Sequence, residues 1–114
     1  MDLRQLRYFL AVAKTGHMTR AAEALGMAQP PLSQQIKGLE TQIGLPLFKR
    51  HAKGVTLTEA GRTLQADATR LLHDFDALQS RTREAEAEAE HLRQEVATLR
   101  LLLDASEKTQ QSDL

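Results

Sequence analysis

The hydrophobic positions in the first part of the chain recur at the three- and four-residue spacing of amphipathic helices. The first helix is predicted to begin after an Asp2 cap and to end at Gly16. A second, shorter helix is predicted to begin at a Thr19 cap and to end at Gly26. The apolar residues that would face a core from these two helices are Leu3, Leu6, Phe9, Leu10, Ala13, Ala21, Ala22 and Leu25.

A third helix is predicted to start near Pro30, since proline is favoured in the first helical turn, and to end at Gly44. Its buried stripe would consist of Leu32, Ile36, Leu39 and Ile43. Two short β-like runs follow at 47–50 and 55–57, and residues 51–54 would join them as a hairpin with Gly54 in the turn. The pattern predicts a mainly α fold: a winged helix-turn-helix domain over residues 1–58, with three helices and a β-hairpin wing.

After Gly61 the chain contains neither glycine nor proline, and one long helix is predicted from about Glu59 to about Leu103, capped by Thr58. Apolar residues continue along it in heptads, which favours a coiled coil over a single helix packed on a globular partner. The residues predicted to mediate dimerisation are Leu64, Leu71, Phe75, Leu78, Ala85, Ala89, Leu92, Val96 and Leu99. The polar tail, residues 104–114, is predicted to be disordered.

The charges divide the chain in the same way as the pattern does. The total is zero, with 15 basic and 15 acidic side chains, which taken alone argues against a nucleic-acid-binding protein. Residues 1–62, however, carry nine basic and four acidic side chains, and residues 63–114 carry six and eleven. A head of charge +5 joined to a tail of charge −5 indicates DNA contact by the head.

The exposed face of the third helix offers groups that can read base edges. Pro30, Ser33, Gln34 and Lys37 share one stripe opposite the apolar residues, and Gln29 lies at its N-terminal edge. Glutamine can form two hydrogen bonds to adenine, serine can donate or accept, and lysine can reach guanine or phosphate. Free backbone N–H groups at the start of this helix would also favour a phosphate.

The hairpin is basic, which suits a phosphate clamp or insertion into the minor groove. The candidate contacts of the wing and the DNA backbone are Thr19, Arg20, Lys49, Arg50, His51 and Lys53. Taken alone, a polar helix face or a basic hairpin is more often a solvated surface than a DNA contact. Their joint occurrence in the basic half favours DNA.

The motifs LRYF, TRAAEAL, AQPPLSQQI, LPLFKR and LTEAGR, at this spacing, resemble the DNA-binding domain of LysR-type transcriptional regulators. The resemblance covers residues 2–62 and continues weakly to about Leu78 as the linker helix of that family. It implies that Lys53 reaches the minor groove, and that the residues meeting the major groove are Gln29, Pro30, Pro31, Ser33 and Gln34. The family more often has arginine at positions 34 and 53, so one bidentate guanine contact is lost at Gln34.

The orientation of the predicted helix pair is left open by the residues alone. With Leu71 as a d position, the g-to-e′ pairs Arg81–Glu86, Glu88–Arg93 and Glu95–Arg100 are all opposite in sign, as a parallel dimer requires. The resemblance implies antiparallel linker helices, and the small seam residues Thr82, Ala85 and Ala89 are compatible with that. We favour antiparallel pairing near residues 60–80, with the distal heptads joining a second dimer into a tetramer as a hypothesis.

Other chemistry is not indicated. There is no cysteine, and the four histidines do not share a metal-ligand spacing with one another. We therefore expect no metal, no cofactor and no enzyme activity. No apolar run approaches a membrane span and the N-terminus does not resemble a signal peptide, so a cytoplasmic protein without a membrane partner is expected.

Two functions from different classes follow from these features. The first is a sequence-specific regulator that binds a partly palindromic double-stranded DNA site as a homodimer, with a tetramer as a further arrangement. The alternative is a coiled-coil interaction protein that forms mixed dimers with full-length relatives. Nothing in the sequence resembles the start of the family's effector-binding domain, so no small-molecule effector is expected for this chain, whether it is a fragment or a variant without that domain.

Overall fold

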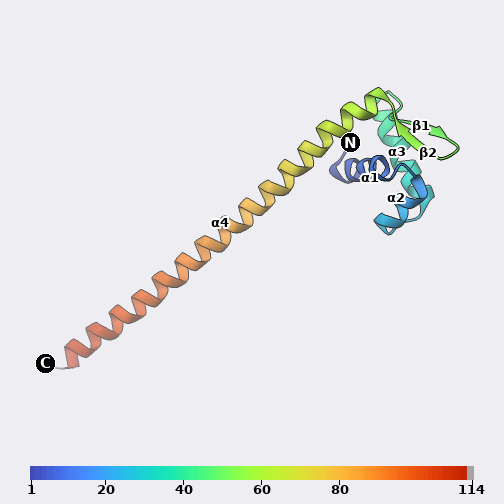
Figure 1. The fold of residues 1–114 in the computed structure, drawn as a ribbon. Coiled ribbons are helices and arrows are strands. Elements are labelled where there is room, and N and C mark those ends of the chain that lie inside the picture. Colours follow the sequence, from blue (N-terminus) through green and yellow to red (C-terminus); the bar gives the residue numbers. More distant parts are fainter. Residues whose placement is uncertain (113–114) are drawn as a thin grey trace. The chain divides into compact units, whose positions relative to one another are not determined.

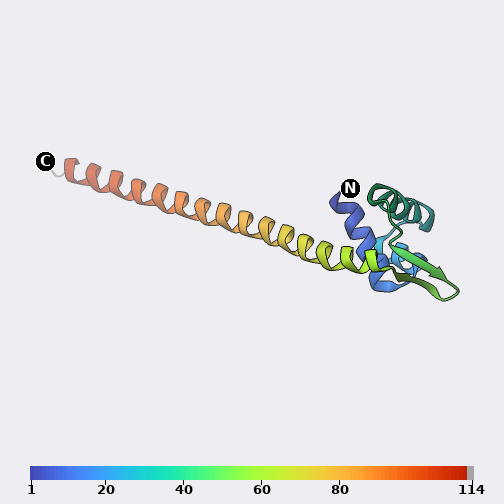
Figure 2. The same cartoon turned by 90° about the horizontal axis from the view of Figure 1, so that it is seen from above.

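The computed structural model describes the backbone of residues 1–112 and the side chains of residues 1–109. Its elements are α1 (Leu3–Thr15), α2 (Met18–Leu25), α3 (Gln29–Ile43), β1 (Phe48–His51), β2 (Gly54–Leu57) and α4 (Glu59–Ser112), as Figure 1 shows. The two strands pair antiparallel as a hairpin that extends away from the helices (Figures 1 and 2). The predicted winged helix-turn-helix fold, followed by a long helix, is confirmed.

The helix ends are explained mostly by the residues that were expected to cap them. The Asp2 carboxylate accepts a hydrogen bond from the Gln5 backbone N–H at 2.7 Å, and the Gln5 side chain accepts one from the Asp2 backbone N–H at 3.3 Å. This capping box holds the start of α1. Gly16, Gly26 and Gly44 end α1, α2 and α3 in the left-handed conformation that favours glycine.

The predicted start of the second helix is wrong. Thr19 already lies inside α2, and the cap is His17, whose backbone is extended and whose Nδ1 accepts from the Arg20 N–H at 3.5 Å. Histidine is not among the preferred N-cap residues, so the pattern pointed to the threonine instead. The third helix starts at Gln29, one residue before the expected position.

The hairpin is tighter than expected. His51 pairs with Gly54, so the connection is the two residues Ala52 and Lys53 and not a loop of four, and Leu47 precedes β1. Gly54 has a φ of +139°, and a Cβ there would lie 2.2 Å from the Gly16 carbonyl oxygen. The glycine is therefore required by a close backbone approach to the α1–α2 turn as well as by its positive φ.

Helix α4 begins as expected, but it does not end at Leu103. The Thr58 hydroxyl accepts from the Gly61 N–H at 3.0 Å, which confirms the predicted cap. The helix continues to Ser112, so the expected disorder of residues 104–112 is wrong, and residues 113 and 114 lie outside the described residues. Alanine, glutamate, lysine and glutamine in this stretch are good helix formers and no helix breaker interrupts it.

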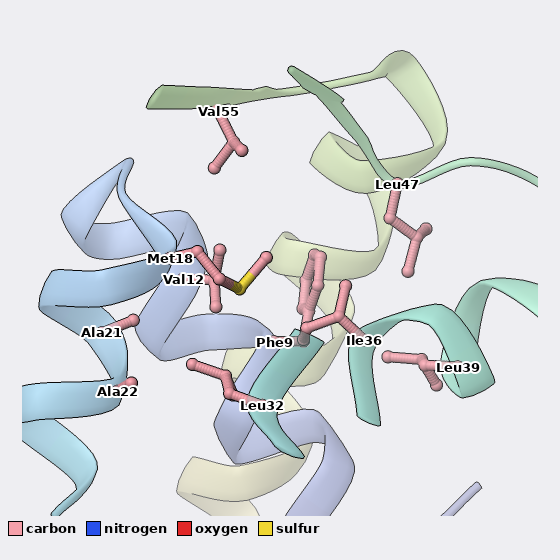
Figure 3. Packing of buried hydrophobic residues seen from close by; sticks show 10 residues of the cluster. All are labelled: Phe9, Val12, Met18, Ala21, Ala22, Leu32, Ile36, Leu39, Leu47 and Val55. Atoms are coloured by element: carbon pink, nitrogen blue, oxygen red, sulfur yellow. The ribbon is translucent and has the colours of Figure 1, made fainter. Parts of the chain in front are cut away.

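The chain divides into two compact units, Met1–Asp74 and the part from Phe75 onward. The core of the first unit is built around the Phe9 ring, which lies 5.2 Å from the Phe48 ring between centroids. Side chains from α1, α2, α3, β2 and the segment before β1 surround Phe9 (Figure 3). The buried residues of this core are Phe9, Val12, Met18, Ala21, Ala22, Leu32, Ile36, Leu39, Leu47 and Val55.

A smaller apolar cluster joins α1 to the beginning of α4. Leu6 packs with Ala68 and Leu72, all three nearly fully buried, and Leu64 packs against both clusters. The first turns of α4 are therefore part of the head's own packing. In the part of the chain that the structure describes, none of the helices combines the length and the apolar character that crossing a membrane requires.

Replacing Gly61 with alanine should destabilise the head. A Cβ at this position would lie 2.2 Å from the Leu47 carbonyl oxygen, so α4 must shift away from the segment before the wing. We expect Gly61→Ala to lower the free energy of unfolding by about 1–3 kcal/mol in urea titrations at a fixed protein concentration.

Gly38→Ala is the matched control, because it also lies in a helix and its Cβ would meet only the Gln5 amide nitrogen, at 3.8 Å. It should be neutral or stabilise by up to about 1 kcal/mol. Equal stability of the Gly61→Ala variant and the unmodified chain would contradict this account of the α4 start.

Candidate nucleic-acid interface

The turn between α2 and α3 is held by backbone bonds and small residues. The Met27 N–H donates to the Ala22 carbonyl at 3.0 Å, beside the left-handed Gly26. Ala21 and Ala22 are almost completely buried and belong to the same core as Leu32 of α3. Because these alanines are small, α2 can pack closely on α3, which fixes the direction in which the outer face of α3 points.

The predicted reading face of α3 is present but is not uniformly open. Pro30, Pro31, Gln34 and Lys37 are exposed, as expected for a face opposite Leu32, Ile36 and Leu39. Gln29 and Ser33 are half-buried, and the Gln29 side-chain amide donates to the Ser33 hydroxyl oxygen at 2.6 Å. The two groups therefore form one polar unit, which leaves the side-chain carbonyl oxygen and the second amide proton of Gln29 and the hydroxyl proton of Ser33 for an external partner.

The expectation that the start of α3 offers a set of free backbone N–H groups needs correction. The helix begins at Gln29, so Pro30 and Pro31 occupy its second and third positions. Proline has no N–H, and half of the four amide groups that a helix normally leaves unpaired at its N-terminus are therefore missing. The prolines fix the start of the helix, and an anion there would depend on side chains more than on the helix terminus.

The wing is attached to the helices by two groups that the sequence did not single out for this role. The Glu40 carboxylate of α3 accepts from the Leu47 N–H at 2.6 Å and, more weakly, from the Phe48 N–H at 3.5 Å. On the second strand, the Val55 N–H donates to the Gly16 carbonyl at 2.9 Å. The sequence did not single out Glu40, because an acid near the end of a helix has no pattern that indicates a distant backbone partner.

The basic side chains of the wing are all exposed, as predicted for Lys49, Arg50, His51 and Lys53. Arg50 is the one that lies nearest to the reading face: together with Ser33, Gln34, Lys37 and Glu40 it lines a hollow of about 330 Å³. Alternation along the strand directs Lys49 to the other face of the hairpin. The structure thus brings Arg50 beside α3, whereas Lys53 lies in the connection at the tip of the hairpin.

The start of α2 lies beside the same region. A second hollow of about 280 Å³ has a wall formed by Thr19, Gln29, Arg50 and His51. Arg20 is exposed in the first turn of α2, where its backbone N–H is used by the His17 cap. Three elements therefore contribute predicted contact residues to one surface. Among the described residues, no cluster of three histidine, aspartate or glutamate side chains is placed to hold a metal ion.

The predicted dimerisation residues fall into two environments. Leu71, Leu78, Leu92, Val96 and Leu99 are each about half exposed, at 47–59% of the residue surface. Ala85 is exposed, and Phe75 and Ala89 are of intermediate exposure. Leu64 packs on the core of its own chain, so its contribution to a partner contact stays a prediction.

A helix-turn-helix followed by a basic hairpin defines the winged class of helix-turn-helix proteins, and the comparisons with known proteins agree. The family of bacterial regulatory helix-turn-helix proteins of the lysR type matches residues 3–62. Over 83 residues, or 73% of its length, the chain is 57% identical to the HTH-type transcriptional regulator BudR of Klebsiella aerogenes. This chain belongs to the lysR family.

Solved structures of the family resemble the same part of the chain. The DNA-binding domain of CbnR in complex with DNA is 41% identical with a TM-score of 0.72, covering 75% of this chain and 98% of that one. The DNA-binding domain of BenM with catB site 1 DNA is 42% identical, also with a TM-score of 0.72, covering 74% and 94%. The chain spans 58% of the length of BudR and 29% and 27% of two further curated relatives.

Removing the Glu40 carboxylate should loosen the wing. Glu40→Ala leaves the Leu47 N–H without its partner, and we expect the free energy of unfolding to fall by about 1.5–3 kcal/mol, the value typical of a hydrogen bond to a charged group. Glu23→Ala on the exposed face of α2 is the control and should change stability by less than about 0.5 kcal/mol. Hydrogen exchange of the β1 and β2 amides would show whether the loss is local to the hairpin, and unchanged exchange and stability would contradict the role of Glu40.

Proposed function

We propose that this chain binds double-stranded DNA in a sequence-specific manner and regulates transcription as a lysR-type regulator. The observation that carries the proposal is the gathering of α3, the start of α2 and the basic wing on one surface, in a fold shared with domains solved on DNA. The head that bears this surface has a net charge of +5 over residues 1–62, which suits a phosphate backbone.

Each part of the surface has a separate role in the proposal. The outer face of α3 enters the major groove, and the residues that meet bases or the groove wall are Gln29, Pro30, Pro31, Ser33, Gln34 and Lys37. The wing and the start of α2 bind the backbone and the adjacent minor groove through Thr19, Arg20, Lys49, Arg50, His51 and Lys53. Arg50 supports both, because it lies in both hollows beside α3.

The bound form is a homodimer that pairs through α4. The exposed apolar residues of α4 support this, since a stripe of half-exposed leucines is stabilised by a second helix. We place the proximal contact at Leu71, Phe75 and Leu78, with antiparallel helices. Dimer symmetry then requires a partly palindromic DNA site. The protein would act in the cytoplasm without catalysing a reaction.

A second function uses the same exposed stripe. The chain would pair with a full-length relative and change the activity of that relative in a mixed dimer. The two functions are separated by one measurement, which is whether the chain alone binds a partly palindromic duplex as a homodimer. A duplex obtained by selection from random sequences, with the mass of the complex measured, provides that test.

Changes on α3 should affect discrimination between sequences more than changes on the wing. We expect Gln29→Ala with Ser33→Ala to weaken binding to the selected duplex about tenfold or more and to leave binding to random duplex nearly unchanged, since a good base contact is worth about 1–3 kcal/mol. Lys49→Ala should weaken both duplexes alike and reduce the salt dependence by about one counterion. Fluorescence anisotropy over a salt series measures both effects. If the Gln29→Ala, Ser33→Ala variant lost as much affinity for the random duplex as for the selected one, the assignment of the reading face would be refuted.

A further inference from the structure

The distal part of α4 has an apolar stripe that packs against no other element among the described residues. Leu92, Val96, Leu99 and Leu103 are exposed at 53%, 47%, 59% and 63%. Within the described residues, the compact unit from Phe75 onward consists of this helix, and none of its side chains belongs to a buried core cluster. In proteins, most of the stability of an amphipathic helix comes from packing its apolar face.

The stripe follows a strict heptad register. Ala85, Leu92 and Leu99 are seven residues apart at d positions, and Ala89, Val96 and Leu103 occupy the a positions between them. This alternation of three- and four-residue steps is the seam of a two-stranded coiled coil. The helix that carries the seam continues to Ser112, past its predicted end at Leu103, while the apolar seam itself stops at Leu103 because the next d position is Ser106.

The charges beside the seam identify the partner and its direction. In a parallel pair each g residue faces an e′ residue five positions later, which places Glu88 beside Arg93′ and Glu95 beside Arg100′. In an antiparallel pair of the same segment, g faces g′ and e faces e′. Glutamates would then face glutamates, and arginines would face arginines.

We propose that residues 85–107 of α4 pair with the same segment of a second copy of this chain, parallel and in register. The charge pattern is self-complementary only in that arrangement, which is why the partner is a second copy and not an unrelated helix. The proposal goes beyond DNA binding and does not depend on it, because no residue of the segment belongs to the α3 or wing surface.

The existing contacts of these charges are compatible with the pair. Arg93 donates to Glu90 at 2.7 Å and to Glu86 at 2.8 Å, and these bonds raise the pKa of Arg93 above its ordinary value. Glu95 lies 3.1 Å from His91. All of these side chains are more than half exposed, so the contacts are weak and the guanidinium keeps donors for Glu88′.

The distal pair also bears on the size of the assembly. An antiparallel contact near Leu71 and a parallel contact near Leu99 conflict for one continuous partner helix. If both form, each chain has different partners at the two contacts, and four chains assemble. If only the distal contact forms, the assembly is a dimer. In either case, breaking the distal contact halves the mass.

Charge reversal at the g positions tests the direction of pairing. We expect Glu88→Arg with Glu95→Arg to weaken the distal association about tenfold or more and to halve the mass at intermediate concentration in sedimentation velocity, because four opposite-charge pairs become like-charge pairs. Adding Arg93→Glu and Arg100→Glu should restore the original mass. An antiparallel pair predicts no loss with the first two changes, and that result would overturn the proposal.

The control is Glu84→Arg with Asp104→Arg, which changes the net charge equally at c and b positions away from the seam. It should leave the mass unchanged. A loss equal to that of the g-position variant would mean that net charge alone governs association, against the proposal. Circular dichroism and duplex binding by the head, measured on each variant, separate a folding defect from a pairing defect.

A cysteine crosslink tests the register directly, since the chain has no cysteine of its own. Leu99→Cys should form a disulfide-linked pair in high yield under mild oxidation of the full chain, whereas Ala97→Cys, at an outer b position, should not. No excess of crosslink at position 99 over position 97 would overturn the proposal. These readouts are independent of DNA, so a failure here leaves the proposed function standing, and a failure to bind DNA leaves the pairing standing.

Discussion

The position of the wing relative to α3 depends on a small set of backbone approaches that only particular residues allow. Gly54 permits β2 to touch the Gly16 carbonyl, and Gly61 permits the start of α4 to touch the Leu47 carbonyl. Between them, the Glu40 carboxylate binds the Leu47 N–H. The side chains that would bind DNA are long and exposed, so their placement relies on this rigid attachment and not on contacts of their own.

The start of α3 has a fixed backbone geometry and few free hydrogen-bond donors. Pro30 and Pro31 fix the first turn of α3 and remove two backbone N–H groups from its terminus. The Gln29–Ser33 hydrogen bond restrains two side chains that would otherwise have several rotamers. In the proposed DNA complex, both features would reduce the entropy lost on binding and leave fewer free donors, so specificity at this end would depend on a few oriented groups.

The two units of the chain differ in how far their own residues bury their apolar side chains. The head buries its own apolar residues around Phe9 and presents charge to the outside. In the described residues from Phe75 onward there is no such core, and the leucines of this segment are exposed, so a second helix would be needed to bury them. The zero net charge of the chain is the sum of +5 over residues 1–62 and −5 over residues 63–114. The basic part suits a phosphate backbone, and the acids and arginines beside the seam of α4 suit a second copy of the chain.

The helices, the hairpin and the winged helix-turn-helix fold could be predicted from the sequence, because they follow from local periodicity and from glycine and proline placement, and the family was indicated by the motifs. It also predicted the exposed reading and wing residues, since an exposed face is the complement of the apolar stripe. It missed the His17 cap and the helical character of residues 104–112, where weak or unusual local signals gave the wrong answer. The role of Glu40, the Gly54–Gly16 and Gly61–Leu47 approaches and the position of Arg50 beside α3 became visible in the folded structure alone. Each of these joins groups that are distant along the chain, and no local pattern records such a contact.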